Sequence, residues 1–399
     1  MKIRHAPPIH LTYCLNVHPG ESWPENLAAI AGKTLKVRDR VGVDRPFGLG
    51  LRLSRLAAGQ LARPETLGAF RRFLRDHGLY VFTINGFPYG SFHAAPVKTD
   101  VYRPDWRRGE RRDYTIDLAD ILAGLMDEGL TGSISTVPGS YGQWIRSDAD
   151  VAAMAETLAD VAAHLHTVRC ARGKEIVLAL EPEPDCYLED VSGTIGFLTG
   201  PLAKTGAARL AGTLGVDASA ARDILTRHIG VCLDTAHLAV KFEDLADGAR
   251  RLTAAGVRVG KVQLSSALQL DGSPQALAEV ERFNDAVYLH QVSVLAGDGT
   301  MQTYPDLPDA LADPRAQGDD CRWRVHFHVP LHFTAAGALE STAELLDGRS
   351  AAVLADGLTE HIEIETYTYD VLPEPLRPFD VIDGIAAEYG RALKLLGAG

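Results

Sequence analysis

The sequence predicts a closed (β/α)8 TIM barrel, an α/β fold in which eight parallel strands alternate with helices. Three observations favour this fold class. Eight short apolar runs alternate with longer helical patterns, several of these runs end in an acidic residue, and two connections are unusually long. The 399 residues are 46% hydrophobic and 23% charged, a composition that supports a large core and excludes a disordered or fibrous protein.

Eight runs rich in apolar and β-branched residues are the expected strands of the barrel. They comprise residues 9–15, 48–53, 80–84, 132–136, 176–181, 230–234, 259–264 and 362–365. A ninth run of this kind, residues 323–328, then belongs to an insertion or replaces one of the eight.

The clearest helical pattern covers residues 151–168, between the fourth and fifth expected strands. Its apolar residues recur every three or four positions and form one stripe, made of Val151, Met154, Leu158, Val161, Leu165 and Val168. Asp148 and Asp150 precede this stripe, as is typical of caps and of acids in a first helical turn. We therefore expect an amphipathic helix that packs its stripe on the barrel sheet.

Two stretches, residues 86–113 and 265–322, are too long for ordinary connections between a strand and a helix. Long loops after barrel strands lie on the catalytic face, so both are expected to act as lids. The sequence shows no fixed-period repeat, no low-complexity tract and no linker. We therefore expect residues 1–399 to form a single TIM-barrel domain with these two lid-like insertions.

Charge and cysteine content restrict the class of protein. Forty Lys and Arg face 52 Asp and Glu, and the formal net charge of −12 argues against nucleic-acid binding. Five widely spaced cysteines without a C-x-x-C pair exclude a thiolate zinc knuckle and a disulfide framework. Neither a signal peptide nor an apolar run of the roughly 18 residues needed to span a membrane is present. We therefore expect a soluble, cytoplasmic protein.

Three of the expected strands end in a carboxylate. Glu181 ends one strand, Asp234 ends the next with His237 three residues later, and Glu363 and Glu365 alternate in the last. A barrel gathers the C-terminal ends of its strands at one face, where the active site lies. An oxygen-rich site with imidazoles suits a divalent metal such as Mn²⁺, Zn²⁺, Co²⁺ or Mg²⁺.

Each acid taken alone has a simpler explanation. A carboxylate at a strand end can cap the following helix, and Glu363 fits a salt bridge as well as a metal ligand. The convergence of three strand ends, rather than any single residue, therefore carries the prediction of a metal site.

These segments resemble a known superfamily. Leu-Glu181-Pro, Leu-Asp234-Thr-Ala-His237 and Ile-Glu-Glu365-Thr resemble the metal-binding strands of xylose isomerase-like TIM barrels. That superfamily includes sugar isomerases, ketose 3-epimerases and the endonuclease IV type of phosphodiesterase. More narrowly, the segments HLTYCLNVHPG from residue 10, NGFPYG from residue 85 and HFHVP from residue 326 resemble the EboE family. That family is associated with a bacterial gene cluster that moves a metabolite from cytoplasm to periplasm.

The resemblance implies roles for several residues. Glu181, Asp234 and Glu365 would be metal ligands, and His237 would be a further ligand or a hydrogen-bond partner of the substrate. Gln263 stands where the superfamily usually has a histidine, which departs from its pattern. The endonuclease IV type also draws ligands from a segment between its last two strands, so His326 or His328 would compensate. We expect one of these two histidines, rather than both, to reach the metal.

The resemblance favours metal-dependent aldose–ketose isomerisation or epimerisation as the function. In such enzymes one carboxylate removes the proton next to a polarised carbonyl and a second acid returns it, roles that Glu181 and Glu365 would take. Substrate contacts are expected from five further residues, namely Asn16, His18, Tyr89, Trp106 and Gln263. The expected partners are a small-molecule metabolite and a membrane protein of the same gene cluster, with no nucleic acid.

Two alternatives remain open. A non-catalytic protein that binds a metabolite and hands it over is favoured by Gln263, because an altered ligand set accompanies changed or lost chemistry. A hydrolase of the endonuclease IV type would need a histidine-rich, multi-metal site, and the net charge of −12 disfavours it. Arginines do cluster within residues 98–112, but acids are interleaved with them, as on a solvated surface.

Overall fold

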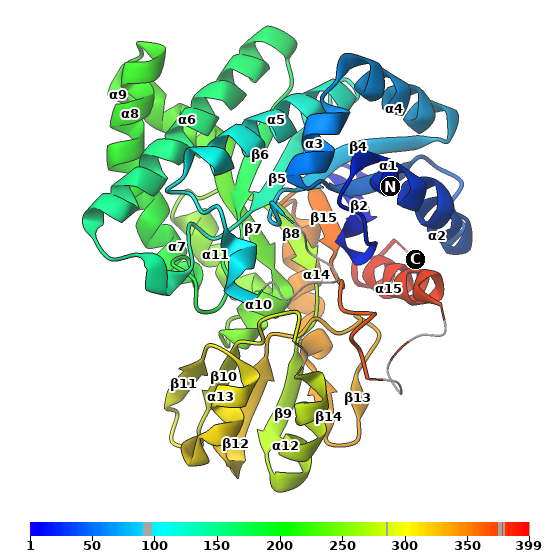
Figure 1. The fold of residues 1–399 in the computed structure, drawn as a ribbon, viewed down its shortest axis with the longest axis vertical. Coiled ribbons are helices and arrows are strands. Elements are labelled where there is room, and N and C mark those ends of the chain that lie inside the picture. Colours follow the sequence, from blue (N-terminus) through cyan, green and yellow to red (C-terminus); the bar gives the residue numbers. More distant parts are fainter. Residues whose placement is uncertain (91–97, 285, 374–376, 378–379, 399) are drawn as a thin grey trace.

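The computed structural model describes residues 1–399 except 91–97, 285, 374–376, 378–379 and 399. Eight parallel strands form a barrel, and each matches an expected strand to within two residues at either end (Figure 1). The strands are β2 (Pro8–Tyr13), β3 (Phe47–Arg52), β4 (Leu79–Asn85), β5 (Gly132–Thr136), β6 (Ile176–Leu180), β7 (Ile229–Asp234), β8 (Val259–Leu264) and β15 (His361–Ile364). The predicted fold class is confirmed.

The barrel closes around β15, which pairs in parallel with both β8 and β2. A parallel bridge between Cys14 and Gly50 joins the edges of β2 and β3, and β1 (Lys2–His5) pairs antiparallel with β2 on the outside. Gly50 has no room for a side chain, because a Cβ there would lie 2.0 Å from the Glu363 carboxylate and 2.8 Å from the Tyr13 carbonyl oxygen. The closing seam therefore requires glycine at this position.

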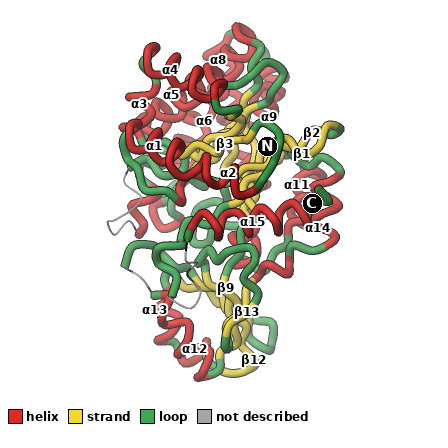
Figure 2. Tube along the Cα trace, turned by 90° about the vertical axis from the view of Figure 1, so that its right-hand side faces the viewer, coloured by secondary structure: helices red, strands yellow, loops and turns green. Residues whose placement is uncertain are grey.

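Helices surround the barrel on its outside (Figure 2). They are α1 (Trp23–Ala29), α2 (Leu35–Val41), α3 (Arg55–Leu61), α4 (Pro64–Asp76), α5 (Gly109–Leu125), α6 (Asp148–Arg172), α7 (Val191–Phe197), α8 (Ala207–Leu214), α9 (Ala218–His228), α10 (Thr235–Val240), α11 (Leu245–Ala254), α14 (Gly348–Ala355) and α15 (Val381–Leu395). Helix α6 extends the predicted pattern at both ends, because a Ser147–Asp150 capping box starts it and left-handed Gly173 ends it. Within the described ranges, no helix has the length and apolarity that crossing a membrane requires.

The connection after β8 folds into a second, antiparallel sheet of six strands, which lies beyond the end of the barrel in Figure 1. Its strands are β9 (Leu268–Gly272), β10 (Val292–Leu295), β11 (Met301–Tyr304), β12 (Gly318–Val325), β13 (Ala335–Ala336) and β14 (Leu339–Ser341), with helices α12 (Pro274–Val280) and α13 (Leu307–Ala312) beside them. The ninth apolar run lies in this insertion, since β12 pairs with β9 and β10. The insertion therefore continues past the predicted end at residue 322 to β14.

The other long connection is partly packed rather than solvated. Arg111 is fully buried and donates hydrogen bonds to the carbonyl oxygens of Gly86, Phe87 and Pro104. These bonds hold the two ends of the described part of the connection together.

Side chains on β8 and β15 fill the barrel interior at successive heights. His361, Glu363 and Glu365 are two residues apart and face inward one above another. The Lys261 Nζ lies 2.6 Å from the Glu363 Oε2, and both side chains are fully buried. Burial alone would lower the pKa of Lys261, but the neighbouring Glu363 carboxylate raises it above its ordinary value. Of the two interpretations left open for Glu363, the structure supports the salt bridge.

Replacing Lys261 by methionine would leave the Glu363 carboxylate buried without its partner. We expect Lys261→Met to lower the free energy of unfolding by about 3–5 kcal/mol, the usual cost of breaking a buried ion pair from one side. The double variant Lys261→Met/Glu363→Leu removes both charges and should recover most of that loss. Urea denaturation of the three proteins measures both effects, and a single variant as stable as the wild type would contradict this role of the pair.

Candidate metal centre

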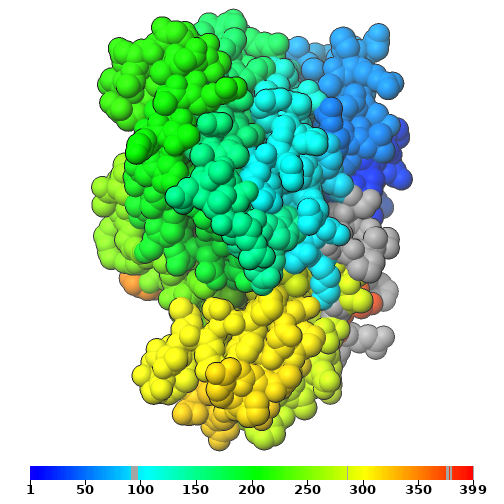
Figure 3. Space-filling view, turned by 60° about the vertical axis from the view of Figure 1, so that its left-hand side comes forward, coloured from blue at the N-terminus to red at the C-terminus, as the bar shows by residue number. Residues whose placement is uncertain are grey.

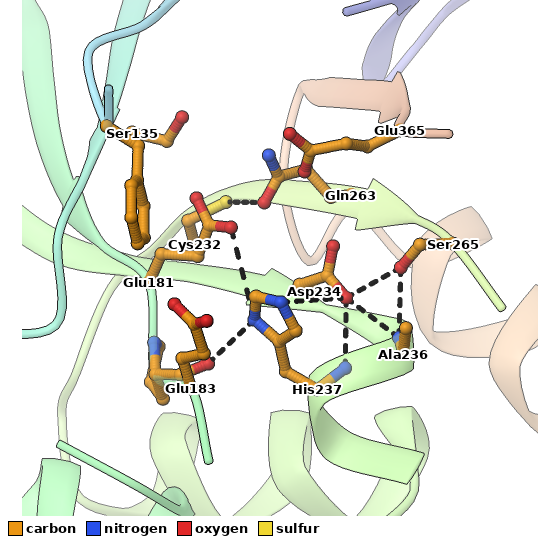
Figure 4. Close-up of polar contacts among 12 residues, drawn as sticks. Ser135, Glu181, Glu183, Cys232, Asp234, Ala236, His237, Gln263, Ser265 and Glu365 are labelled. Atoms are coloured by element: carbon orange, nitrogen blue, oxygen red, sulfur yellow. Dashed lines mark hydrogen bonds and ion pairs between the residues drawn. The ribbon is translucent and has the colours of Figure 1, made fainter. Parts of the chain in front are cut away.

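The carboxylates predicted from the strand ends gather at one end of the barrel, where Glu181 and Glu365 line a cavity and Asp234 lies beside Glu181. Glu181 directly follows β6, Asp234 is the last residue of β7, and Glu365 directly follows β15. Each is at most 4% exposed. Figure 4 shows Glu181, Asp234 and His237 turned toward one another, with Glu365 and Gln263 beside them.

Asp234 acts both as a helix cap and as a site residue. Its Oδ1 accepts hydrogen bonds from the backbone nitrogens of Ala236 and His237 at the start of α10, and from the Ser265 hydroxyl at 2.6 Å. Its Oδ2 is buried and has no hydrogen-bond partner. The cap explanation therefore accounts for one oxygen only.

Other carboxylates at this end of the barrel follow the same pattern. Glu365 accepts hydrogen bonds on Oε1 from the side-chain amides of Asn16 and Asn85, at 2.8 and 3.0 Å. Glu183 accepts one on Oε1 from the Tyr102 hydroxyl at 2.7 Å. The Oε2 atoms of Glu181, Glu183 and Glu365 are buried without a hydrogen-bond partner. Buried carboxylate oxygens of this kind are costly unless a proton or a cation meets them.

Three histidines direct ring nitrogens to the same place. The His237 Nδ1 donates to the Pro182 carbonyl oxygen and the His328 Nδ1 to the Glu365 carbonyl oxygen, at 3.0 and 2.8 Å. Because a backbone carbonyl only accepts, both rings carry a proton on Nδ1, and in the neutral form of each ring Nε2 is a lone pair.

The tautomer of His326 follows from its neighbour Gln291. The amide nitrogen of Gln291 donates to the Pro184 carbonyl oxygen, so its Oε1 faces the His326 Nδ1 at 2.7 Å and accepts that proton. The Nε2 atoms of His326 and His328 lie 3.3 Å apart, and when both rings are neutral with their protons on Nδ1, two lone pairs face one another. A cation between the two nitrogens would convert this repulsion into coordination.

Burial sets the protonation of the histidines. It lowers the pKa of His237 to about 4 and that of His326 well below its ordinary value. Both rings are therefore neutral near pH 7, the form in which imidazole binds a metal.

Burial acts on the acids as well. Burial and the charges of Glu365 and Asp234 raise the pKa of Glu181 well above its ordinary value, and burial with Asp234 does the same for Glu365. Burial raises the pKa of Glu183 to about 8. Burial also opposes ionisation of Asp234, but the nearby His237 and His328 and the Ser265 hydroxyl lower its pKa overall. Glu181, Glu183 and Glu365 are thus buried together with little positive charge nearby to stabilise their ionised forms.

The donor atoms fit a divalent cation. Glu181, Asp234 and His237 form one group whose donor atoms all lie within 4.8 Å of one another, and His237, His326 and His328 form a second. His237 is common to both. Mixed carboxylate oxygen and imidazole nitrogen donors suit Mn²⁺, Co²⁺ or Zn²⁺, and oxygen donors also suit Mg²⁺. Both of the paired histidines reach the site, where one was expected, because residues two apart in an extended segment face the same side.

Gln263 presents the wrong atom for metal binding. The Cys232 thiol donates to its Oε1 at 2.9 Å, so its amide nitrogen faces away from Cys232 and has no partner. Burial raises the pKa of Cys232 well above its ordinary value, which keeps this thiol a donor. An amide N–H group cannot coordinate a cation, so it can serve only as a hydrogen-bond donor.

The cavity above these residues has a volume of about 60 Å³. Of the residues predicted to contact substrate, Asn16 lines this cavity, whereas His18, Tyr89, Trp106 and Gln263 do not. His18 bonds the Tyr13 hydroxyl, Tyr89 packs on Tyr114, and Trp106 is fully buried in the core. Aromatic residues of the long connection thus serve its own packing as well as the cavity.

Several residues that belong to the site were not predicted from the sequence. Asn85 and Glu183 were within reach of the strand-end argument, since Asn85 ends β4 and Glu183 follows β6 by three residues. Gln291 and Tyr367 gave no signal, because they lie in irregular segments.

Comparison with known proteins identifies the fold. No family model and no curated protein matches the sequence. A xylose isomerase-like TIM barrel protein from Mycobacterium smegmatis, solved in complex with magnesium, superposes with a TM-score of 0.52 at 13% identity, covering 98% of this chain and 97% of that one. The chain has the xylose isomerase-like TIM-barrel fold. D-psicose 3-epimerase from Clostridium cellulolyticum H10, solved with D-tagatose, superposes with a TM-score of 0.51 at 12% identity, covering 99% of both chains.

Metal analysis of the purified protein tests the centre. We expect protein prepared without a chelator or histidine tag to contain a stoichiometric divalent metal by ICP-MS, because the unpartnered oxygens and nitrogens otherwise have no compensation. Glu181→Ala/Asp234→Ala should lose this metal, and His326→Ala/His328→Ala should bind it more weakly.

The matched control is His164→Ala/His166→Ala, which removes two imidazoles from α6 and should leave the metal content unchanged. Circular dichroism checks that each variant folds. Full metal content in the carboxylate variant, or none in the wild type after loading, would refute the centre.

Proposed function

We propose that this protein is a divalent-metal-dependent enzyme that isomerises or epimerises a small α-hydroxy carbonyl compound. One observation carries the proposal: Glu181 and Glu365 reach the same cavity from β6 and β15, which are separated in the barrel by β7 and β8. The two carboxylates therefore approach a bound molecule from different walls, and each has a buried Oε2 without a hydrogen-bond partner.

This arrangement suits a proton transfer at carbon. One carboxylate removes the proton from the carbon next to the carbonyl, and the other returns a proton to the same or the neighbouring carbon. Asn16 and Asn85 hold Glu365 by its Oε1 and so leave Oε2 directed to the cavity. Glu181, Asp234, Glu365 and His237, together with His326 and His328, would hold the metal. When bound, a divalent cation polarises the carbonyl and hydroxyl oxygens of the substrate.

The resemblance to the EboE family extends this proposal. The substrate would then be a metabolite destined for transfer from cytoplasm to periplasm, and the chain would work in the cytoplasm beside a membrane protein of its gene cluster. The HFHVP segment that carries this resemblance also supplies His326 and His328 to the metal centre.

A second candidate function is hydrolysis of a phosphoester. The observation in its favour is the group of His237, His326 and His328, since a histidine-rich centre suits activation of a metal-bound water.

The alternative of a non-catalytic protein that binds a metabolite and hands it over rests on Gln263. Its amide nitrogen stands where the superfamily pattern has an imidazole.

Solvent exchange tests the proton transfer. Metal-loaded protein incubated in D₂O with a panel of α-hydroxy carbonyl compounds, which includes sugars, sugar phosphates and aryl-substituted α-hydroxy ketones, should incorporate deuterium next to the carbonyl of at least one compound, as NMR detects. Glu365→Gln keeps the acceptor for Asn16 and Asn85 but cannot move a proton, so the rate should fall by roughly 100-fold or more.

Glu360→Gln is the matched control, because Glu360 lies at the opposite end of β15 and pairs with Thr131. Metal content measured on both variants separates lost chemistry from lost metal. If fully loaded wild-type protein exchanges no proton from any compound, the proposal fails. Hydrolysis of a phosphodiester would then select the second candidate, and saturable binding without turnover would select handover.

A further inference from the structure

The cavity over the metal centre has two chemically different parts. Its floor is polar and consists of the carboxylates, histidines and asparagines described above. Its wall, along the part of the chain that the structure describes, is mainly aromatic and aliphatic. The wall residues include Phe87, Val101, Tyr102, Tyr288, Leu289 and Tyr367.

Tyr102 offers the cavity its ring rather than its hydroxyl. The hydroxyl donates to Glu183 at 2.7 Å and accepts from the amide nitrogen of Gln291 at 3.0 Å. The ring stacks on Tyr141 at 5.6 Å, and Phe87 packs against it at 5.9 Å. These contacts fix the ring, so a ligand meets a preformed apolar surface there.

A second aromatic pair lies beside the metal ligands. The ring of Tyr367 packs against His328 at 4.8 Å and against Tyr288 at 5.2 Å. Tyr288 comes from the inserted sheet region, and Tyr367 follows β15 by three residues. A molecule bound at the histidines therefore has the Tyr367 ring beside it.

The cavity gives little support to a phosphate group. Among the described lining residues, Lys98 is the one lysine or arginine, and its ammonium lies 2.7 Å from Asp306 of the insertion. The pair joins the two long connections, which meet on the molecular surface in Figure 3. Its charge is thus neutralised within the protein.

We infer that the substrate carries an aromatic ring next to the hydroxy-carbonyl group that binds at the floor, and is not a plain sugar or sugar phosphate. This inference rests on the proposed function. A sugar would bury several hydroxyl groups against a wall with few free partners, and each unsatisfied hydroxyl is costly. A ring would instead bury apolar area against Phe87, Tyr102 and Tyr367.

Three hydroxamates that share one metal-binding group but differ in their substituent test which kind of substituent the cavity wall binds. The probes are acetohydroxamate, benzohydroxamate and threonohydroxamate, which carry a methyl, a phenyl and a trihydroxypropyl tail. We expect benzohydroxamate to bind the zinc-loaded full-length protein about tenfold or more tightly than acetohydroxamate by calorimetry, because the phenyl group is buried. Threonohydroxamate should bind no more tightly than acetohydroxamate.

Variants locate the phenyl group. Phe87→Ala should remove most of the advantage of benzohydroxamate while leaving acetohydroxamate binding unchanged. The control Leu56→Ala removes an exposed apolar side chain from α3 and should change neither. Tightest binding by threonohydroxamate, or equal binding of the methyl and phenyl probes, would overturn this inference alone. If no hydroxamate binds a protein that holds its metal, both this inference and the proposed function fail.

Discussion

The balance of charge inside the barrel governs this structure. Lys261 is fully buried and is paired with Glu363, so its ammonium offsets only part of the charge of the acids in the next layer. Glu181, Glu183, Asp234 and Glu365 share a small volume of low dielectric, where like charges repel strongly. The chain supplies hydrogen bonds to one oxygen of most of these groups and none to the other. A divalent cation at this point would supply the charge that the polypeptide lacks.

Local folding requirements and site geometry coincide at several residues. The N-cap of α10 orients Asp234, and the same turn brings His237 back over the strand ends. Glycine at position 50 closes the barrel and also leaves space for the Glu363 carboxylate. The insertion is tied to the barrel by this geometry, because Gln291 fixes the tautomer of His326 while donating to Tyr102 and Pro184. The site is therefore held by backbone elements that the fold needs in any case.

The barrel could be predicted from the sequence because its strands are buried on both faces and read as apolar runs. The carboxylates at strand ends could be predicted for the same reason, because a polar residue that ends such a run lies at the C-terminal face of the barrel. The six-stranded sheet was not, because its strands are short, β11 and β12 are partly exposed, and only the end of β12 overlaps the ninth apolar run. Gln291 and Tyr367 lie in loops, where no periodicity marks the side that a residue faces. The position of Trp106 in the core, rather than over the cavity, likewise depends on packing that a linear pattern does not encode.

The topology of the barrel also orders events during biosynthesis. Its final strand, β15, fits between β8 and β2 and carries Glu365 just beyond its end. The ribosome must therefore release the chain at least as far as Glu365 before the barrel can close and the candidate ligand set can assemble. Until then the strand edges of β2 and β8 that pair with β15 have no partner, and the nascent chain lacks part of the candidate metal site. A metal that needs this whole ligand set would consequently bind only after β15 has taken its place in the barrel.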